Sequence, residues 1–139
     1  LGLSKRCLEE ASAYVAHRMS FGQTLAAHEG VQWMLGDVAK DIQIGRLLTM
    51  QAAWKLDQGD FARSDISIAK IHAADTLHKA ADTAIQLLGA RGYSKDTIVE
   101  WIYRYARQAR LVDGASEIHK MVLSRAYLSE GQDFFRWGV

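Results

Sequence analysis

Asp113 is the residue with the clearest opportunity for chemistry in this sequence. It precedes Gly114, and the two residues interrupt one helical pattern just before another begins. A carboxylate there faces a helix N-terminus, where free N–H groups and the helix dipole favour negative charge. It can act as a base if an apolar, water-poor pocket raises its pKa from about 3.9. The alternative is structural: Asp113 caps the next helix through the N–H groups of Ala115 or Ser116.

Metal chemistry is disfavoured by the spacing of the potential ligands. A helical di-iron site requires two Glu-x-x-His pairs, and no glutamate of this chain has a histidine three residues later. The five histidines are scattered without a recognisable ligand set, at His17, His28, His72, His78 and His119. The single cysteine, Cys7, excludes an intrachain disulfide and a Cys-rich zinc site, and its apolar surroundings indicate a core residue. We expect no metal site.

Three arginines recur at every third position near three aromatic residues: Arg104, Arg107, Arg110, Trp101, Tyr103 and Tyr105. Such a stripe is one pattern by which proteins bind nucleic acid. The formal net charge of the chain is only +1, however. We therefore interpret the stripe as a solvated or ion-paired helix surface, a phosphate contact or a subunit contact, and expect no nucleic-acid partner.

Apolar residues recur with helical spacing through nearly the whole chain, which contains 0 prolines. We expect an all-α protein whose helices contain residues 3–15, 31–52, 66–87, 97–106 and 118–126. Ile118, Met121, Val122 and Ala126 mark the expected buried side of the last helix. An aromatic-rich tail follows from Gly131 to Val139.

Glycines and one capping pattern predict where these helices end and begin. Glycine stops are expected at residues 18–22, near Gly59 and at residues 88–92, and Thr97 with Glu100 has the spacing of a capping box. Long helices joined by short turns favour an up-and-down four-helix bundle with an additional C-terminal helix. No apolar run approaches the ~20 residues needed to cross a bilayer, so a soluble protein without a membrane span is expected.

Three segments of this sequence, in order, resemble the C-terminal helical domain of acyl-CoA dehydrogenases. Residues 18–22 resemble the Arg-x-x-Phe-Gly segment of that family, residues 86–93 its Gln-x-x-Gly-Gly-x-Gly-Tyr segment, and residues 104–117 its catalytic-loop segment. The resemblance implies that residues 1–139 are this domain of a larger enzyme. It also implies that the domain alone is inactive.

The first segment, by this resemblance, binds FAD across a subunit interface. Arg18 contacts the pyrophosphate, Ser20 forms a hydrogen bond nearby, and Phe21 packs beside the adenosine half. A guanidinium suits bidentate phosphate recognition. The alternative interpretation makes Arg18 a cation at a helix C-terminus and Phe21 a core residue.

The second segment, by the same resemblance, places Gln86 and Gly89 against the adenine end of a neighbouring subunit's FAD. Ala90 stands where the family usually has a second glycine. The alternative to FAD binding is a structural role, in which the segment forms a helix C-cap followed by a turn. That role explains the glycines but assigns no function to Gln86.

The third segment implies that Asp113 removes the α-proton of an acyl-CoA thioester while the β-hydrogen leaves as hydride to FAD, giving a 2,3-enoyl-CoA. Ala115 and Glu117 replace the threonine and glutamine that contact flavin in the family. Some family members carry the base on the first helix of this domain instead.

The family forms homodimers or homotetramers and passes electrons to an electron-transferring flavoprotein. The resemblance implies a cytoplasmic protein in a bacterium, or a mitochondrial or peroxisomal one in a eukaryote. Two other functions stay open from the sequence: an acyl-CoA oxidase and a non-catalytic helical assembly module.

Overall fold

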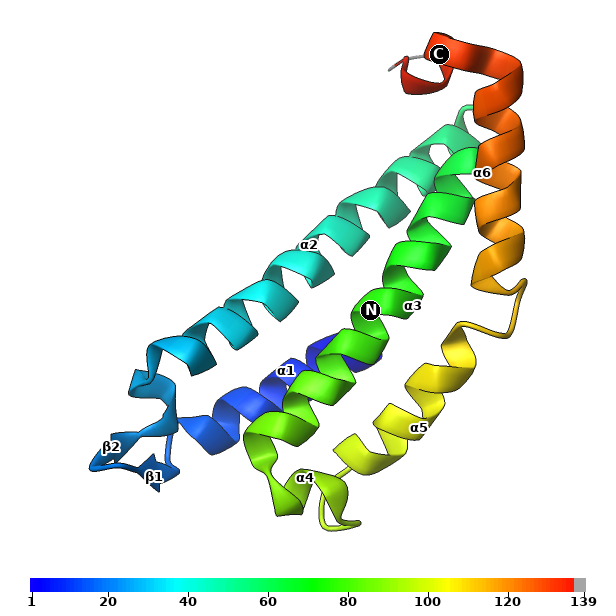
Figure 1. Ribbon diagram of the computed structural model, residues 1–139. Helices are drawn as coiled ribbons and strands as arrows, with labels where there is room; N and C mark the ends of the chain where they lie inside the picture. Colours follow the sequence, from blue (N-terminus) through cyan, green and yellow to red (C-terminus); the bar gives the residue numbers. More distant parts are fainter. Residues whose placement is uncertain (137–139) are drawn as a thin grey trace.

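The computed structural model describes residues 1–136, and long helices account for most of them (Figure 1). These helices are α1 (Gly2–Val15), α2 (Glu29–Asp57), α3 (Arg63–Leu88), α5 (Val99–Ala109) and α6 (Ser116–Glu130). The short elements are β1 (Met19–Ser20), β2 (Gln23–Thr24), α4 (Ala90–Tyr93) and the 3₁₀ turns η1 (Leu25–Ala27) and η2 (Gly131–Phe135). The predicted all-α fold is confirmed. The last three residues of the predicted aromatic tail lie outside the described residues.

Helix α3 is the central element of the fold, because it packs against α1, α2, α5 and α6. Helices α1, α2, α3 and α5 alternate in direction, as the up-and-down bundle predicts (Figure 1). Helix α6 then continues beyond α5 along the same side of α3. His78 of α3 packs on Tyr103 of α5, whereas Ser67 near the start of α3 contacts His119 of α6. α6 is therefore the predicted additional C-terminal helix.

Small residues let α3 approach its neighbours closely. Ala80, Ala81 and Ala84 are fully buried on α3, facing a core that includes Cys7 and Ile102, both 0% exposed. Close contact of this kind maximises dispersion interactions between helices. The prediction that Cys7 is a core residue is confirmed.

The first helix ends earlier than the sequence predicts. It closes at Val15, and a small hairpin of β1 and β2 follows, with Met19 paired to Thr24. The prediction of a glycine stop at residues 18–22 is wrong in this respect. Phe21 and Gly22 have φ angles of 51° and 81° and form the turn between the two strands. Two successive positive φ angles match the right-handed twist of a hairpin, so Gly22 serves the turn.

The capping box predicted at Thr97 and Glu100 does not form. The residue before α5 is Ile98, and the Thr97 hydroxyl accepts a hydrogen bond from the N–H of Val99 at 3.4 Å. The Glu100 carboxylate instead forms an ion pair with Arg104, one helical turn later, at 2.9 Å between Oε1 and Nε. An ion pair along the helix has replaced the reciprocal cap.

Helix α6 buries its predicted face only in part. Ile118 and Met121, expected on the buried side, are 50% and 39% exposed. His119 and Val122 face the bundle and are half-buried. The expectation is wrong for Ile118 and Met121, whereas Val122 and Ala126 are half-buried as predicted; His119, beside them, is hydrogen-bonded to Ser67 of α3. Within residues 1–136, no helix is both long and apolar enough to span a membrane.

Candidate functional site

Asp113 lies in the loop between α5 and α6, at the turn where the two helices meet (Figure 1). Asp113 and Gly114 both have left-handed backbones, with φ angles of 54° and 86°. The Asp113 side chain is exposed. No residue within 1–136 donates a hydrogen bond to its carboxylate or forms an ion pair with it. Leu111 and Val112 beside it are 58% and 38% exposed. The loop therefore presents a free acid flanked by apolar side chains.

Side chains from α3 and α6 hold the backbone of this loop. His119 donates from Nε2 to the carbonyl of Asp113 at 3.2 Å, and its Nδ1 accepts from the Ser67 hydroxyl at 3.1 Å. Lys70 donates from Nζ to the carbonyl of Gly114 at 2.6 Å. Both carbonyls of the left-handed pair are thus bonded to side chains that rigid helices carry.

The alternative that Asp113 caps α6 is wrong. The cap position is Ala115, and no side chain caps the helix. The N–H of Ser116 is bonded to the carbonyl of Arg110 at 3.1 Å instead. The Asp113 carboxylate therefore accepts no hydrogen bond from the first turn of α6. Ala115 itself is half-buried, and Glu117 is exposed in the first turn of α6, where the helix dipole favours a carboxylate.

The hairpin carries the first predicted cofactor segment. His28 holds its shape: Nε2 donates to the carbonyl of Ser20 at 3.1 Å, and Nδ1 accepts from the Gln23 amide at 3.1 Å. Phe21 stands at the tip, 97% exposed, with its ring edge-on to that of His28. The alternative that Phe21 is a core residue is wrong, because the turn projects its ring away from the bundle.

Arg18 follows the end of α1 and lines a groove of about 560 Å³ between α1 and the end of α3. His17 and Arg91 line the same groove with it, and Tyr14 and Leu88 supply apolar surface. Guanidinium groups next to apolar surface suit a ligand that combines a phosphate with a flat ring. Arg91 was missed by sequence reasoning, although its place within the glycine-rich segment was a usable signal.

The glycine-rich segment joins α3 to α4 beside this groove. Gln86, Gly89 and Ala90 are all exposed there. Gly89 has φ 61° and ψ −141°, a conformation that is essentially restricted to glycine. At Gly92, an added Cβ would lie 2.8 Å from the Cβ of Leu88. Glycine is therefore required at the two flanking positions, whereas Ala90 begins α4 in a helical conformation that accepts a side chain.

The two groups of predicted residues lie far apart within one chain. Lys70 of α3 touches the Asp113 loop, whereas Leu88 lines the Arg18 groove. The 18 helical steps from Lys70 to Leu88 span roughly 27 Å at the helical rise of about 1.5 Å per residue. The structure places the hairpin and the glycine-rich segment toward the same end of α3, away from the loop that carries Asp113 (Figure 1).

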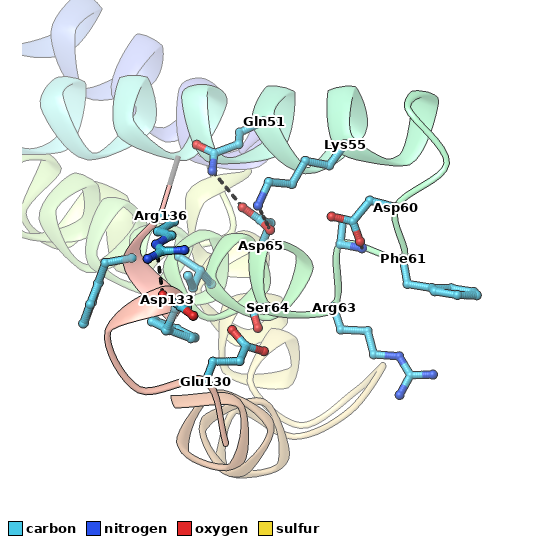
Figure 2. Close-up of a pocket in the computed structure, with 14 residues that line it drawn as sticks. Gln51, Lys55, Asp60, Phe61, Arg63, Ser64, Asp65, Glu130, Asp133 and Arg136 are labelled. Carbon is cyan, nitrogen blue, oxygen red and sulfur yellow. Dashed lines mark hydrogen bonds and ion pairs between the residues drawn. The ribbon is translucent and has the colours of Figure 1, made fainter. Parts of the chain in front are cut away.

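A second groove of about 560 Å³ lies between the α2–α3 connection and η2 (Figure 2). Its charged groups mostly satisfy one another: Asp65 accepts from both Lys55 and Gln51 at 2.8 Å, and Asp133 pairs with Arg136 at 2.9 Å. None of the residues predicted from the sequence to act in a site lies here.

The arginine stripe on α5 is largely ion-paired surface. Arg104 pairs with Glu100, and Arg110 pairs with Asp75 of α3 at 3.5 Å. The rings of Trp101 and Tyr105 stack on each other at 5.3 Å. Across the part of the chain that the structure describes, no three His, Cys, Asp or Glu side chains gather to hold a metal ion.

Comparison with known proteins shows the family of this chain. The family model described as "Acyl-CoA dehydrogenase, C-terminal domain" matches residues 1–128. The chain belongs to the acyl-CoA dehydrogenase family.

Individual members of this family are similar over nearly the whole chain. The short-chain-specific acyl-CoA dehydrogenase of Clostridium acetobutylicum is 36% identical over 124 residues, 89% of this chain and 33% of that protein. The 3-(aryl)acrylate reductase of Clostridium sporogenes is 32% identical over 89% of this chain and 33% of its own length. The structure of butyryl-CoA dehydrogenase from Megasphaera elsdenii superposes with a TM-score of 0.88 at 30% identity, covering 91% of this chain and 33% of that one. The chain spans about a third of the length of these relatives.

Proposed function

We propose that the protein is an FAD-dependent acyl-CoA dehydrogenase, in which residues 1–139 form the C-terminal domain. The observation that carries this proposal is the Asp113 loop, held open by α3 and α6 in a chain of this family. The reaction is the α,β-dehydrogenation of an acyl-CoA thioester to a 2,3-enoyl-CoA. The isolated domain is expected to be inactive, because it supplies only part of the two binding sites.

Asp113 is the proposed base. Its free carboxylate takes the α-proton of the thioester, while the β-hydrogen leaves as hydride and a double bond forms between the two carbons. A carboxylate surrounded by water is too weak a base for this task, so water must be excluded around it when the substrate is bound. The exposed Leu111 and Val112 provide apolar surface that the bound acyl chain and the rest of the enzyme would cover.

FAD fits the residues at the other end of α3. Arg18 and Arg91 are suited to the pyrophosphate, with Ser20 nearby, and the exposed ring of Phe21 is suited to the adenosine half. Gln86, Gly89 and Ala90 form an exposed backbone edge beside them, and Ala115 with Glu117 follows the acid at the start of α6. When bound, FAD supplies the acceptor for the hydride.

The distance between the two residue groups supports an assembly of at least two subunits. The Arg18 groove lies at one end of α3, and the Asp113 loop contacts α3 roughly 27 Å away along the helix. Both can contact FAD if each contacts a different FAD molecule. We propose a homodimer or homotetramer in which the Arg18 groove contacts the FAD of a neighbouring subunit. An electron-transferring flavoprotein is the proposed acceptor, and the bacterial relatives favour the cytoplasm as the location.

The test uses the purified full-length protein with bound FAD. Acyl-CoA thioesters are added anaerobically and the flavin absorbance is followed, with butyryl-CoA first because a structural relative acts on it by name. We expect bleaching in the wild type and none in Asp113→Asn, with FAD content unchanged. Flavin reduction that survives in Asp113→Asn would place the base elsewhere, such as the first helix of the domain.

The same preparation separates the other two functions. Hydrogen peroxide formed in air at the rate of substrate turnover would identify an acyl-CoA oxidase. Absence of bleaching with every acyl-CoA tested would favour a non-catalytic assembly module.

A further inference from the structure

The backbone of the proposed base is held by side chains that lie outside the loop. The carbonyls of Asp113 and Gly114 accept hydrogen bonds from His119 and Lys70, and Ser67 holds the other nitrogen of the His119 ring. Ser67 is 3% exposed, so this end of the network is inside the bundle. The network joins two consecutive left-handed residues to two different helices.

The tautomer of His119 follows from these partners. A backbone carbonyl can only accept, so Nε2 carries the proton that it donates to Asp113. In the neutral ring, Nδ1 then accepts from the Ser67 hydroxyl. The Asp113 carbonyl therefore fixes the tautomer of the imidazole, and Ser67 holds the other ring nitrogen and with it the ring orientation, as the outer partner of a functional histidine does elsewhere.

The His119 imidazole lies so close to Gly114 that a side chain at position 114 would collide with it. A Cβ added to Gly114 would lie 2.9 Å from Nε2 of His119. The imidazole therefore packs on the face of Gly114 while it bonds to the preceding carbonyl. A displacement of the ring would free both the carbonyl and the left-handed turn that directs the Asp113 carboxylate outward.

We propose that His119, Ser67 and Lys70 are positioning residues for the acid, fixing the Asp113–Gly114 turn so that the carboxylate reaches the α-carbon of the substrate. This inference rests on the proposed function of Asp113. A misplacement of about 1 Å is enough to slow a positioned reaction about 100-fold. Within residues 1–136, the side-chain hydrogen bonds of these three residues end on the backbone of the acid's loop or join His119 to Ser67, so their loss should affect the chemical step more than binding.

The experiment compares full-length, FAD-loaded variants in single-turnover flavin reduction. We expect His119→Ala to slow reduction about 10- to 100-fold, with FAD content and the Kd for acyl-CoA within about twofold of wild type. His119→Gln retains an amide donor for the carbonyl and should recover most of the rate. Exchange of the substrate α-proton with D₂O should slow in parallel, because it reports the base directly.

His72→Ala is the matched control. His72 also lies on α3 and donates from Nε2 to a backbone carbonyl, that of Asp41, at 2.8 Å. Its loss should lower the thermal midpoint without slowing flavin reduction. If His119→Ala lowers the midpoint but leaves the rate within twofold, or if His119→Gln fails to recover the rate, the positioning role is refuted.

Lys70→Met and Ser67→Ala keep the inference testable if His119→Ala does not fold. Each should slow reduction less than His119→Ala, and unchanged rates in both would refute the inference. Asp113→Asn, measured in the same experiment, distinguishes failure of the positioning role from failure of Asp113 as the base. If it abolishes reduction while the positioning variants remain fast, only the inference fails; if it remains active, the proposed base fails and the inference with it.

Discussion

At the scale of single residues, the Asp113–Gly114 turn is held by side chains that lie far from it in the sequence. A break between two helical patterns locates the acid, and a left-handed backbone is tolerated by aspartate better than by most residues. The side chains that hold the turn could not be predicted. Ser67 and Lys70 lie 52 and 44 positions from their partners, and the bonds to the loop itself end on backbone carbonyls, which every residue carries.

Cys7 yields a prediction on reactivity at this scale. It is 0% exposed, and burial, with a smaller effect from the charge of Glu10, raises the pKa of its thiol to about 11. Only the thiolate reacts with alkylating reagents, so at pH 8 a thiol with this pKa reacts about 100-fold more slowly than one at the ordinary value. Pulsed iodoacetamide labelling of the full-length protein, read by mass spectrometry on the Cys7 peptide, should show at least this protection relative to denaturant. Equal labelling in both states would contradict it.

The same thiol gives stability a defined pH dependence. The folded state holds the proton more tightly than the unfolded state, for which the reference pKa is 9.0. Its contribution to the free energy of unfolding is therefore complete below pH 9 and is lost as the pH rises from 9 to about 11. Cys7→Ala should lose this part of the alkaline decline in thermal midpoint and keep the rest.

At the scale of elements, apolar periodicity predicted the long helices and their order. The connection at Gly59 and the end of α3 at Gly89 agree with the glycine signals. Local features that depend on competing hydrogen bonds were not predictable. His28 donates a hydrogen bond within the hairpin after Val15, and Glu100 pairs with Arg104 in place of capping α5. The apolar periodicity of the sequence predicts neither of these interactions.

Gly92 provides a prediction at the scale of elements. A Cβ there would meet the Cβ of Leu88 at 2.8 Å and the Cα of Ile85 at 2.9 Å, and these atoms belong to the packed end of α3. Gly92→Ala should destabilise the full-length protein by about 1–3 kcal/mol, because overpacking forces backbone shifts. Loss of FAD on gel filtration should accompany it, since the shift occurs beside Arg91.

Gly36→Ala is the matched control for this prediction. Gly36 lies within α2, and an added Cβ would meet no atom within 4 Å. Alanine in an open helical position should stabilise by about 0.5–1 kcal/mol. Thermal unfolding that shifts in the same direction for both variants would contradict the packing argument.

At the scale of the whole molecule, the outer face of α2 is unusually apolar for a free surface. Trp33, Leu47, Met50 and Trp54 are 65%, 60%, 64% and 48% exposed and lie opposite the buried Val38 and Ala52. Large exposed apolar patches mark interaction sites. Within the proposed oligomer, this face is where another subunit or another domain of the enzyme would pack.

Leu47→Glu tests that placement. A charge at the centre of a covered apolar face is costly to bury, so the variant should shift the full-length protein to smaller assemblies in sedimentation velocity at micromolar concentration. Ser12→Glu adds the same charge at an exposed polar position of α1 and should leave the assembly intact. An unchanged distribution for Leu47→Glu would show that this face is not an assembly interface.

A histidine holds the hairpin of β1 and β2, and another holds the Asp113–Gly114 turn. The two turns differ in how much of the polypeptide must be synthesised before each can form. His28, Gln23 and Ser20 lie within eight positions of one another, so the hairpin can take shape early as the chain leaves the ribosome. The Asp113 turn requires α3 and α6 to be docked across more than forty intervening positions. A nascent or truncated chain that stops before α6 would thus carry the hairpin without an aligned acid, and competence for proton removal would arise only when synthesis of the domain is nearly finished.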